Sequence, residues 1–441
     1  MFIVRVKYNK LPICTNTYSY DGLRLYLQYS CSDAIMIAFK KDFRCHMFNK
    51  EMYSLGSKRS VIRELFEYGK QRAAQYGADS VFDFSLGNPS VAAPDCVNSA
   101  IKELVETLDS AALHGYTSAQ GDFGVRRTVA EFLNEKYSAR YSADNIYMTC
   151  GAAAGLAIAI RALCEKGDEF ILIAPHFPEY NVFVKAAGGT PITVPFSDDF
   201  QIDIESLKNA LTPRTKAVIV NSPNNPCGVI YTQKTLAALA EVLSEFEKKF
   251  FKPIYIIADE PYRELAYGDA DVPFIPSIYA DTVLCYSFSK SLSLAGERIG
   301  YLAVNPDSQN ARDLYLAIMG AGRAMGYVCA PVLFQRVAAK CIAARPKIEE
   351  YKVNRDFLYG ALSEIGYECV YPDGAFYLFV KAIGSSAEFS EKAKKYGLLI
   401  VPADDFAAPG WIRIAYCVDA DMIRRSVPLF AQLYNECTQD K

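Results

Sequence analysis

Short apolar runs alternate with helical patterns through the middle of the chain. Apolar residues recur at helical spacing over 155–163 and 235–246, and uninterrupted apolar stretches lie before, between and after such segments. Strands that are buried on both faces have continuous apolar runs, and alternating strands and helices build a parallel sheet covered by helices. The pattern therefore predicts an α/β fold with a mainly parallel sheet. The predicted strands are residues 170–174, 217–220, 254–258 and 282–286.

The two ends of the chain differ from this middle part. Residues 1–51 are rich in tyrosine and cysteine with little periodicity, whereas helical spacing begins near Ser57. We interpret residues 1–51 as an N-terminal appendage that is either disordered or an over-extended start, with a small structured segment as the alternative. From about Gly326, longer helical patterns and shorter strands indicate a second, smaller domain. The predicted organisation is the appendage at 1–51, the N-terminal part of the small domain at 52–95, the large domain at 96–325 and the C-terminal small domain at 326–441.

Composition removes several classes of function. The net charge is −3, with 47 lysines and arginines against 50 acidic residues, so no basic face for nucleic acid is expected. The 13 cysteines form no C-x-x-C pair, which favours reduced thiols in a cytoplasmic protein. Three histidines give poor support for a Ser-His-Asp hydrolase or a metal site. No apolar run reaches the roughly 20 residues of a membrane-spanning helix, and no signal peptide is evident.

Residues that could bind a ligand or take part in catalysis follow each of the predicted strands. In parallel sheets, ligands bind beyond the carboxyl ends of the strands. Each of these turns, taken alone, has an ordinary explanation as a helix cap, a tight turn or close packing. Together they place several different chemical groups at one edge of the sheet. They are Gly151, Ala152 and Ala153 after residues 147–149, Phe177 after 170–174, Asn225 after 217–220, and Asp259 and Tyr262 after 254–258.

The last of these strand ends carries a lysine among serines. The segment SFSKSLSLAGERIG at 287–300 contains Lys290 between Ser287, Ser289 and later serines, and Arg298 follows eight residues after the lysine. Such a segment is either a solvated loop or a place where a reactive, anionic group is held.

These motifs in combination resemble the class I and II aminotransferases, which are fold-type I enzymes that use pyridoxal 5'-phosphate. The resemblance rests on N-S-P-N-N-P-C-G at 221–228, D-E-P-Y at 259–262 and S-F-S-K followed by Arg298, and it covers about residues 57–435. Within the family, the chain is most similar to the aspartate and aromatic aminotransferases. The resemblance implies a large domain with a mainly parallel sheet covered by helices, and a smaller α+β domain.

The resemblance also implies how the cofactor is held. Lys290 corresponds to the lysine that forms a Schiff base with the cofactor aldehyde, and it needs a lowered pKa to act as a nucleophile. The phosphate would be bound by Ser287, Ser289 and Arg298 and by backbone N–H groups of Gly151, Ala152 and Ala153. Many relatives carry serine or threonine in this last turn, where the chain has alanine.

The remaining cofactor residues surround the ring. Asp259 would keep the pyridine nitrogen protonated, so that the ring can accept electrons. Asn225 and Tyr262 would hydrogen-bond the phenolic oxygen, and Phe177 would stack on the ring face. Lys290, Asp259 and Tyr262 are the predicted catalytic residues.

The substrate side has a similar correspondence. Arg413 lies between Ile412 and Ile414 in a predicted strand, so alternation places it on the opposite face from both. It resembles the arginine that binds the substrate α-carboxylate, with Gly87 and Asn225 nearby. Tyr116 resembles a tyrosine that reaches the cofactor phosphate of a neighbouring subunit, which implies a homodimer with shared sites.

The sequence therefore predicts a transaminase that moves the amino group of an L-amino acid to a 2-oxo acid such as 2-oxoglutarate, by a ping-pong mechanism. Aspartate is the favoured donor through the resemblance alone. Arg323 and Lys58 are candidate partners for a side-chain carboxylate, although the sequence does not place them. The first alternative is a C–S β-lyase or a related elimination enzyme on the same fold. The second is a transcription regulator with an aminotransferase-like domain, but residues 1–51 lack a basic helix-turn-helix pattern.

Overall fold

The computed structural model describes residues 17–20, 23–29, 35–37, 48–57 and 61–439. The chain divides into two units, Met1–Glu64 and Leu65–Lys441. The described part of the first unit contains an antiparallel sheet in the order β1-β2-β3 and a short helix. Its elements are β1 (Thr17–Tyr20), β2 (Leu23–Tyr29), β3 (Ile35–Ile37) and α1 (Lys50–Ser57). Most of the predicted appendage lies outside the described residues, so its disorder stays a prediction. Helix α2 (Val61–Tyr76) begins before the boundary at Glu64 and continues into the second unit.

The second unit is built around a seven-stranded sheet in the order β5-β11-β10-β9-β8-β6-β7. Strand β11 is antiparallel to both of its neighbours, and all other pairs are parallel. All four predicted strands are present, as β6, β8, β9 and β10. The strands are β5 (Ile146–Thr149), β6 (Glu169–Ile173), β7 (Thr190–Val194), β8 (Thr215–Asn221), β9 (Tyr255–Asp259), β10 (Thr282–Ser287) and β11 (Gly300–Val304).

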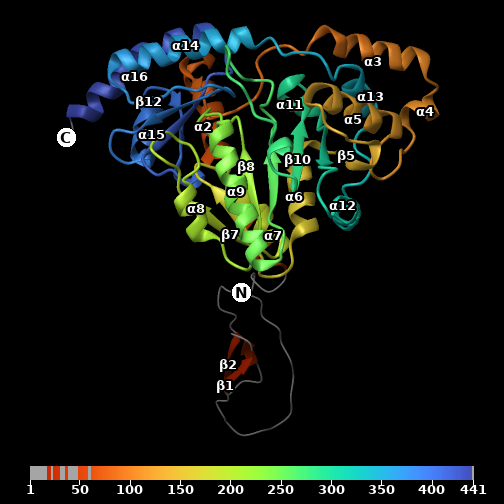
Figure 1. The fold of residues 1–441 in the computed structure, drawn as a ribbon. Helices are drawn as coiled ribbons and strands as arrows, with labels where there is room; N and C mark the ends of the chain where they lie inside the picture. Colours follow the sequence, from red (N-terminus) through yellow and green to blue (C-terminus); the bar gives the residue numbers. More distant parts are fainter. Residues whose placement is uncertain (1–16, 21–22, 30–34, 38–47, 58–60, 440–441) are drawn as a thin grey trace. The chain divides into compact units, whose positions relative to one another are not determined.

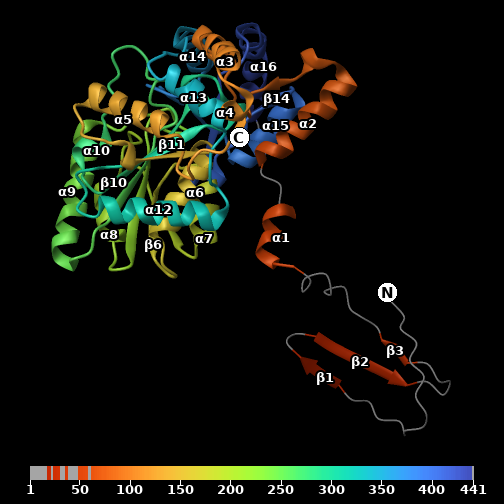
Figure 2. The same ribbon diagram turned by 90° about the vertical axis from the view of Figure 1, so that its right-hand side faces the viewer.

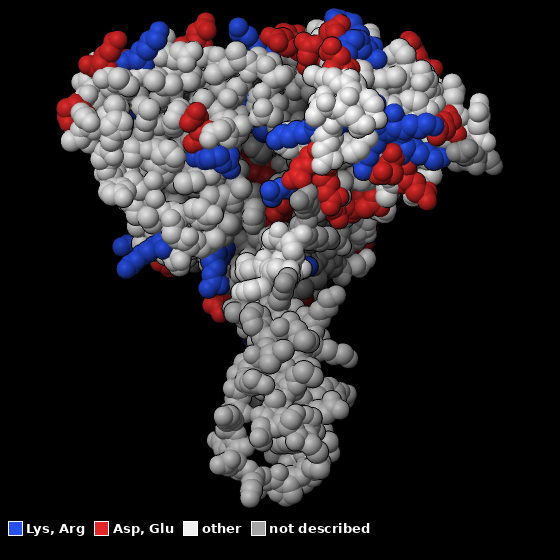
Figure 3. Space-filling model, turned by 180° about the vertical axis from the view of Figure 1, so that it is seen from behind, with Lys and Arg blue, Asp and Glu red and all other residues white. Residues whose placement is uncertain are grey.

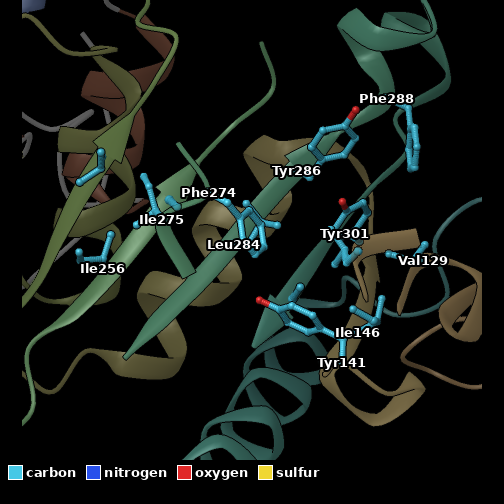
Figure 4. Close-up of a cluster of buried hydrophobic side chains, with 14 of the residues drawn as sticks. Val129, Tyr141, Ile146, Ile256, Phe274, Ile275, Leu284, Tyr286, Phe288 and Tyr301 are labelled. Carbon is cyan, nitrogen blue, oxygen red and sulfur yellow. The ribbon is translucent and has the colours of Figure 1, made fainter. Parts of the chain in front are cut away.

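Helices cover both faces of this sheet (Figures 1 and 2). Alternation along β6 shows the division: Phe170 and Leu172 pack with α6, α7 and α12, whereas Ile171 and Ile173 pack with helices of the opposite face. Figure 4 shows part of that second core, where Tyr286 and Phe288 lie beside Tyr301. The helices around the sheet are α3 (Asp95–Thr107), α4 (Ser110–His114), α5 (Phe123–Tyr137), α6 (Gly151–Leu163), α7 (Glu179–Ala187), α8 (Ile204–Ala210), α9 (Gln233–Phe250), α10 (Ile275–Ile278), α11 (Phe288–Ser291), α12 (Ala311–Met325) and α13 (Val332–Lys340).

A smaller antiparallel sheet follows, in the order β12-β13-β16-β15. A separate parallel pair, β4 with β14, joins the segment near residue 82 to the C-terminal part of the chain. The strands are β4 (Phe82–Asp83), β12 (Cys369–Val370), β13 (Tyr377–Lys381), β14 (Leu398–Leu399), β15 (Val401–Pro402) and β16 (Trp411–Ala415), and the helices are α14 (Ile348–Ile365), α15 (Ser386–Lys395) and α16 (Ala420–Gln439). Within the described residues, 3₁₀ turns lie at Ala78–Ser80, Ala143–Asn145, Ala295–Glu297 and Asp404–Phe406.

Together these observations give an α/β unit with a mainly parallel sheet and a smaller α+β part, as predicted. The domain boundaries at 95 and 325 stay predictions. Side chains of both signs mingle on the face seen in Figure 3, without an extended patch of one sign. Among the described residues, no helix is long and apolar enough to cross a membrane.

Candidate active site

The predicted residues meet where β8, β9 and β10 end and where β16 of the smaller sheet approaches them. The Lys290 Nζ donates a hydrogen bond to the Gly87 carbonyl at 2.6 Å. The Arg413 guanidinium donates from Nη1 to Asn225 Oδ1 at 3.0 Å and from Nη2 to the Ser85 carbonyl at 2.6 Å. Segments far apart in sequence, 85–87, 225, 290 and 413, are thus joined in one site.

An anion cradle lies at the start of α6. The N-cap Cys150 makes no side-chain cap hydrogen bond, so the first N–H groups of α6, from Gly151 to Ala153, are available to an anion. Gly151 has φ of 78°, and a Cβ there would lie 3.0 Å from Arg298 Nη2. Glycine is favoured here chiefly because other residues are strained at this positive φ.

Two serines complete this cradle. The Ser287 and Ser289 hydroxyls are 2.7 Å apart, and the Ser289 N–H donates to Ser287 Oγ at 3.1 Å. Both serines are buried. A guanidinium, two hydroxyls and free helix N–H groups are the donors that a phosphate dianion takes, so the cradle fits the predicted cofactor phosphate.

Asp259 is a buried carboxylate at the end of β9, with one oxygen paired and the other free. Its Oδ2 accepts a hydrogen bond from the Tyr180 hydroxyl at 2.6 Å, while Oδ1 has no partner among the described residues. Burial raises the pKa of Asp259 to about 7, with the Tyr180 hydrogen bond acting in the opposite direction and Glu260 adding to the rise. A buried carboxylate oxygen without a partner is costly, and a protonated ring nitrogen of the cofactor would satisfy it.

Tyr180 was missing from the sequence prediction. It lies in the first turn of α7, three residues after Phe177, and is fully buried. The signal was its position in the turn P-H-F-P-E-Y, which follows a strand of the same sheet. Phe177 itself is half-buried and meets the Tyr180 ring edge-on at 5.7 Å. Its stacking on the cofactor stays a prediction.

Lys290 has the properties of a nucleophile and base. Burial lowers its pKa to about 8, the nearby Cys417 opposes this, and the positive charges of Arg298 and Arg413 add to the lowering. The ammonium lies 5.2 Å from the centre of the Phe376 ring. At pH 7, about a tenth of this amine is therefore neutral, compared with less than about a thousandth of an ordinary surface lysine.

Arg413 is buried and fixed on several sides. Its guanidinium lies 4.7 Å from the Tyr377 ring and 5.1 Å from the Phe406 ring, and its Nε has no partner among the described residues. Ile412 and Ile414 point into the core of the smaller sheet, as alternation predicts. A buried cation with an unused N–H suits a carboxylate ligand.

Tyr262 and Gly87 both touch Tyr377, a residue that the sequence prediction omitted. The hydroxyls of Tyr262 and Tyr377 are 2.9 Å apart. A Cβ on Gly87 would lie 1.9 Å from the Tyr377 hydroxyl, so only glycine allows this approach.

Two residues of the sequence prediction are exposed on the surface, and a third has no described position. Tyr116 is 97% exposed, in the loop between α4 and α5, and takes no part in the site of its own chain. Arg323 is exposed in the last turn of α12, and Lys58 lies outside the described residues. In the described part of the chain, no group of three or more metal-binding side chains is present, and the ten described cysteines are free.

Comparisons with known proteins agree with this geometry. The profile of the family "Aminotransferase class I and II" matches residues 79–428. A probable aspartate aminotransferase of Methanocaldococcus jannaschii is 29% identical over 86% of this chain and 97% of its own length. A crystal structure of an amino transferase from Eubacterium rectale is 54% identical, with a TM-score of 0.87 over 88% of this chain and 99% of its own. The aspartate aminotransferase of Thermotoga maritima is 27% identical, with a TM-score of 0.78 over 88% and 100% of the two chains.

The matched region contains the seven-stranded sheet, the sheet β12-β13-β16-β15 and every residue of the site from Gly87 to Arg413. The family match thus agrees with a site that already offers a phosphate cradle, an unpaired buried carboxylate and an amine of lowered pKa. The chain accordingly belongs to the class I and II aminotransferases, and it is a pyridoxal 5'-phosphate-dependent transaminase of fold type I.

Proposed function

We propose that this transaminase takes the amino group of an L-amino acid, with L-aspartate as the favoured donor, and passes it to a 2-oxo acid such as 2-oxoglutarate. The observation that carries the proposal is the loop Ser85–Gly87. Its two ends accept hydrogen bonds from the carboxylate-binding candidate Arg413 and from the candidate base Lys290. The preference for aspartate is supported by the names of relatives such as the Thermotoga maritima enzyme.

The chain's own residues have separable tasks in this reaction. Arg413 binds the α-carboxylate and fixes the amino acid with its α-hydrogen near Lys290. Lys290, as a neutral amine, accepts the α-proton at Nζ and returns it elsewhere on the bound molecule. Asp259 would keep the ring nitrogen of the bound cofactor protonated, through its unpartnered Oδ1. When bound, pyridoxal phosphate supplies an electron-poor ring that makes the α-hydrogen acidic.

The first experiment is a visible absorbance spectrum of the purified protein, before and after L-aspartate. We expect a yellow band that moves to shorter wavelength with the amino acid and returns with 2-oxoglutarate. L-Phenylalanine and L-alanine serve as matched donors with one carboxylate. A yellow band that responds to another donor and ignores aspartate would contradict the aspartate preference. Release of ammonia and pyruvate without amino transfer would favour the β-lyase alternative.

The pKa of Lys290 gives a pH prediction. When pyridoxal phosphate is added to the cofactor-free protein, the rate of yellow colour formation should rise with pH through a midpoint of about 8. The reason is that only the neutral amine attacks an aldehyde, and its neutral fraction grows through the pKa. Rapid-mixing absorbance at several pH values measures this rate. A midpoint above about 10, the value of an ordinary lysine, would contradict the lowered pKa.

We also propose a homodimer in which Tyr116 of each copy serves the partner's site. Exposed apolar side chains near Tyr116 support this proposal. The Cys329 N–H donates a hydrogen bond to the Ala119 carbonyl, which joins the Tyr116 loop to the segment after α12. Phe123, Tyr327 and Val328 are 59%, 41% and 42% exposed there. A solution mass twice that of the 49.0 kDa chain is expected. A cytoplasmic location remains the prediction from sequence.

A further inference from the structure

We propose that Tyr377 is a positioning residue that couples the cofactor side of the site to its carboxylate side. The inference rests on the proposed roles of Tyr262 and Arg413, and it assigns to Tyr377 an influence on both. Its side chain contacts the hydroxyl of Tyr262, the backbone of Gly87 and the guanidinium of Arg413.

The fold explains why one side chain reaches all three. Tyr377 is the first residue of β13, and it pairs with Ala415 of β16, two residues beyond Arg413. Residues two apart on a strand lie on the same face of the sheet, and so do directly paired residues. Tyr377 therefore lies on the same face as Phe379 and its partner Arg413. Tyr377 is 2% exposed, so the contacts form in a site shielded from water.

The direction of the hydroxyl pair follows from counting hydrogens. Among the described residues, the Tyr262 hydroxyl bonds only to Tyr377. Each phenol has a single hydrogen to donate. If Tyr262 gives its hydrogen to the cofactor's phenolic oxygen, then Tyr377 must donate to Tyr262. A hydroxyl that accepts a hydrogen bond becomes a stronger donor, so Tyr377 strengthens the bond that Tyr262 makes.

Tyr377 contacts Arg413 through its ring and not through its hydroxyl. The guanidinium lies 4.7 Å from the centre of the Tyr377 ring and 5.1 Å from that of the Phe406 ring, while Asn225 Oδ1 and the Ser85 carbonyl accept hydrogen bonds from its Nη atoms. Aromatic rings on a guanidinium attract its charge and fix its plane. The Tyr377 ring therefore orients Arg413 for a carboxylate, whereas the Tyr377 hydroxyl acts on Tyr262.

This division can be tested with Tyr377→Phe, which removes the hydroxyl and keeps the ring. The readout is the pH midpoint of the yellow absorbance of the cofactor-loaded protein, which reports protonation of the nitrogen joined to Lys290. A weaker donor at the phenolic oxygen leaves more negative charge there, and that charge favours the protonated form. We expect the midpoint to rise by roughly half a pH unit, the size that one ordinary hydrogen bond allows.

A double variant shows whether the effect passes through Tyr262. In a Tyr262→Phe protein, the added Tyr377→Phe change should leave the midpoint where it is. Tyr367→Phe is the matched control, because Tyr367 is also buried in the smaller domain and donates its hydroxyl to the Phe430 carbonyl at 3.0 Å. An unchanged midpoint in Tyr377→Phe, or an equal shift in both backgrounds, would overturn the inference.

Tyr377→Leu tests the ring. We expect the KM for the amino acid to stay within about twofold in Tyr377→Phe and to rise about 3- to 30-fold in Tyr377→Leu, as loss of a cation–π contact allows. Equal KM values in the two variants would overturn the Arg413 part. If the wild-type protein gains no yellow absorbance with pyridoxal phosphate, the proposed site fails as a whole. A yellow wild type with unresponsive Tyr377 variants removes this inference alone.

Discussion

Replacing Lys290 with alanine is expected to lower kcat by at least about 10⁴-fold, because one amine serves both as the covalent attachment and as the carrier of the α-proton. The protein should still bind pyridoxal phosphate, since the Ser287, Ser289, Arg298 and α6 donors remain. Its absorbance should be that of a free aldehyde and not of a lysine adduct. Single-turnover absorbance after addition of the amino acid, compared with wild type, measures the loss.

Lys290→Arg is the matched control for charge. It keeps a cation near the Gly87 carbonyl but stays protonated at all accessible pH values, so we expect it to be as inactive as the alanine variant. Added ethylamine should restore part of the activity in Lys290→Ala, in proportion to the concentration of its neutral form. An alanine variant with more than about a tenth of wild-type activity would contradict the assignment of the base. If ethylamine restored Lys290→Arg as well as Lys290→Ala, the amine would not be acting from the space that the lysine side chain leaves in the alanine variant.

The residues predicted at the strand ends lie together in the structure, for a physical reason. Asn225, Asp259 and Lys290 each follow a local apolar run, and parallel pairing brings the ends of β8, β9 and β10 to one edge. Local pattern and sheet topology are enough to gather them. Gly87 and Arg413 come from segments that no local pattern joins to that edge, and their assignment came from the family resemblance.

Tyr180 and Tyr377 were not predicted because their roles depend on contacts that span many residues. The Tyr180 hydroxyl reaches Asp259 across 79 positions, and the Tyr377 hydroxyl reaches Tyr262 across 115. Buried tyrosines are common in this chain, so composition cannot distinguish these two from ordinary core residues. Tyr116 illustrates a different limit, since its proposed task requires a second copy of the chain.

Asp259→Asn should lower kcat by about 10²- to 10³-fold, because the ring nitrogen loses the carboxylate that keeps it protonated. Tyr180→Phe is the matched control. It removes one hydrogen bond to the same carboxylate but keeps the charge, so its kcat should fall by no more than about tenfold. Steady-state kinetics at saturating cofactor compares the two. An asparagine variant with kcat within tenfold of wild type would contradict the role of the carboxylate.

The same substitution has an expected effect on the stability of the cofactor-free protein, and its sign follows from the raised pKa. The Asp259 carboxyl binds a proton up to pH about 7 when folded, but only up to pH about 4 when unfolded. Between these values the folded state holds the extra proton, so this group makes the wild type less stable as pH rises, by at most about 1.4 kcal/mol per pH unit. Asparagine lacks this dependence. The free energy of unfolding of the variant minus that of the wild type should therefore increase from pH 5 to pH 7.5 in urea titrations. A constant difference would mean that Asp259 is already ionised at pH 5 without the cofactor. An increase would show that ionised Asp259 destabilises the cofactor-free protein, and a cationic ring of the bound cofactor would offset this cost.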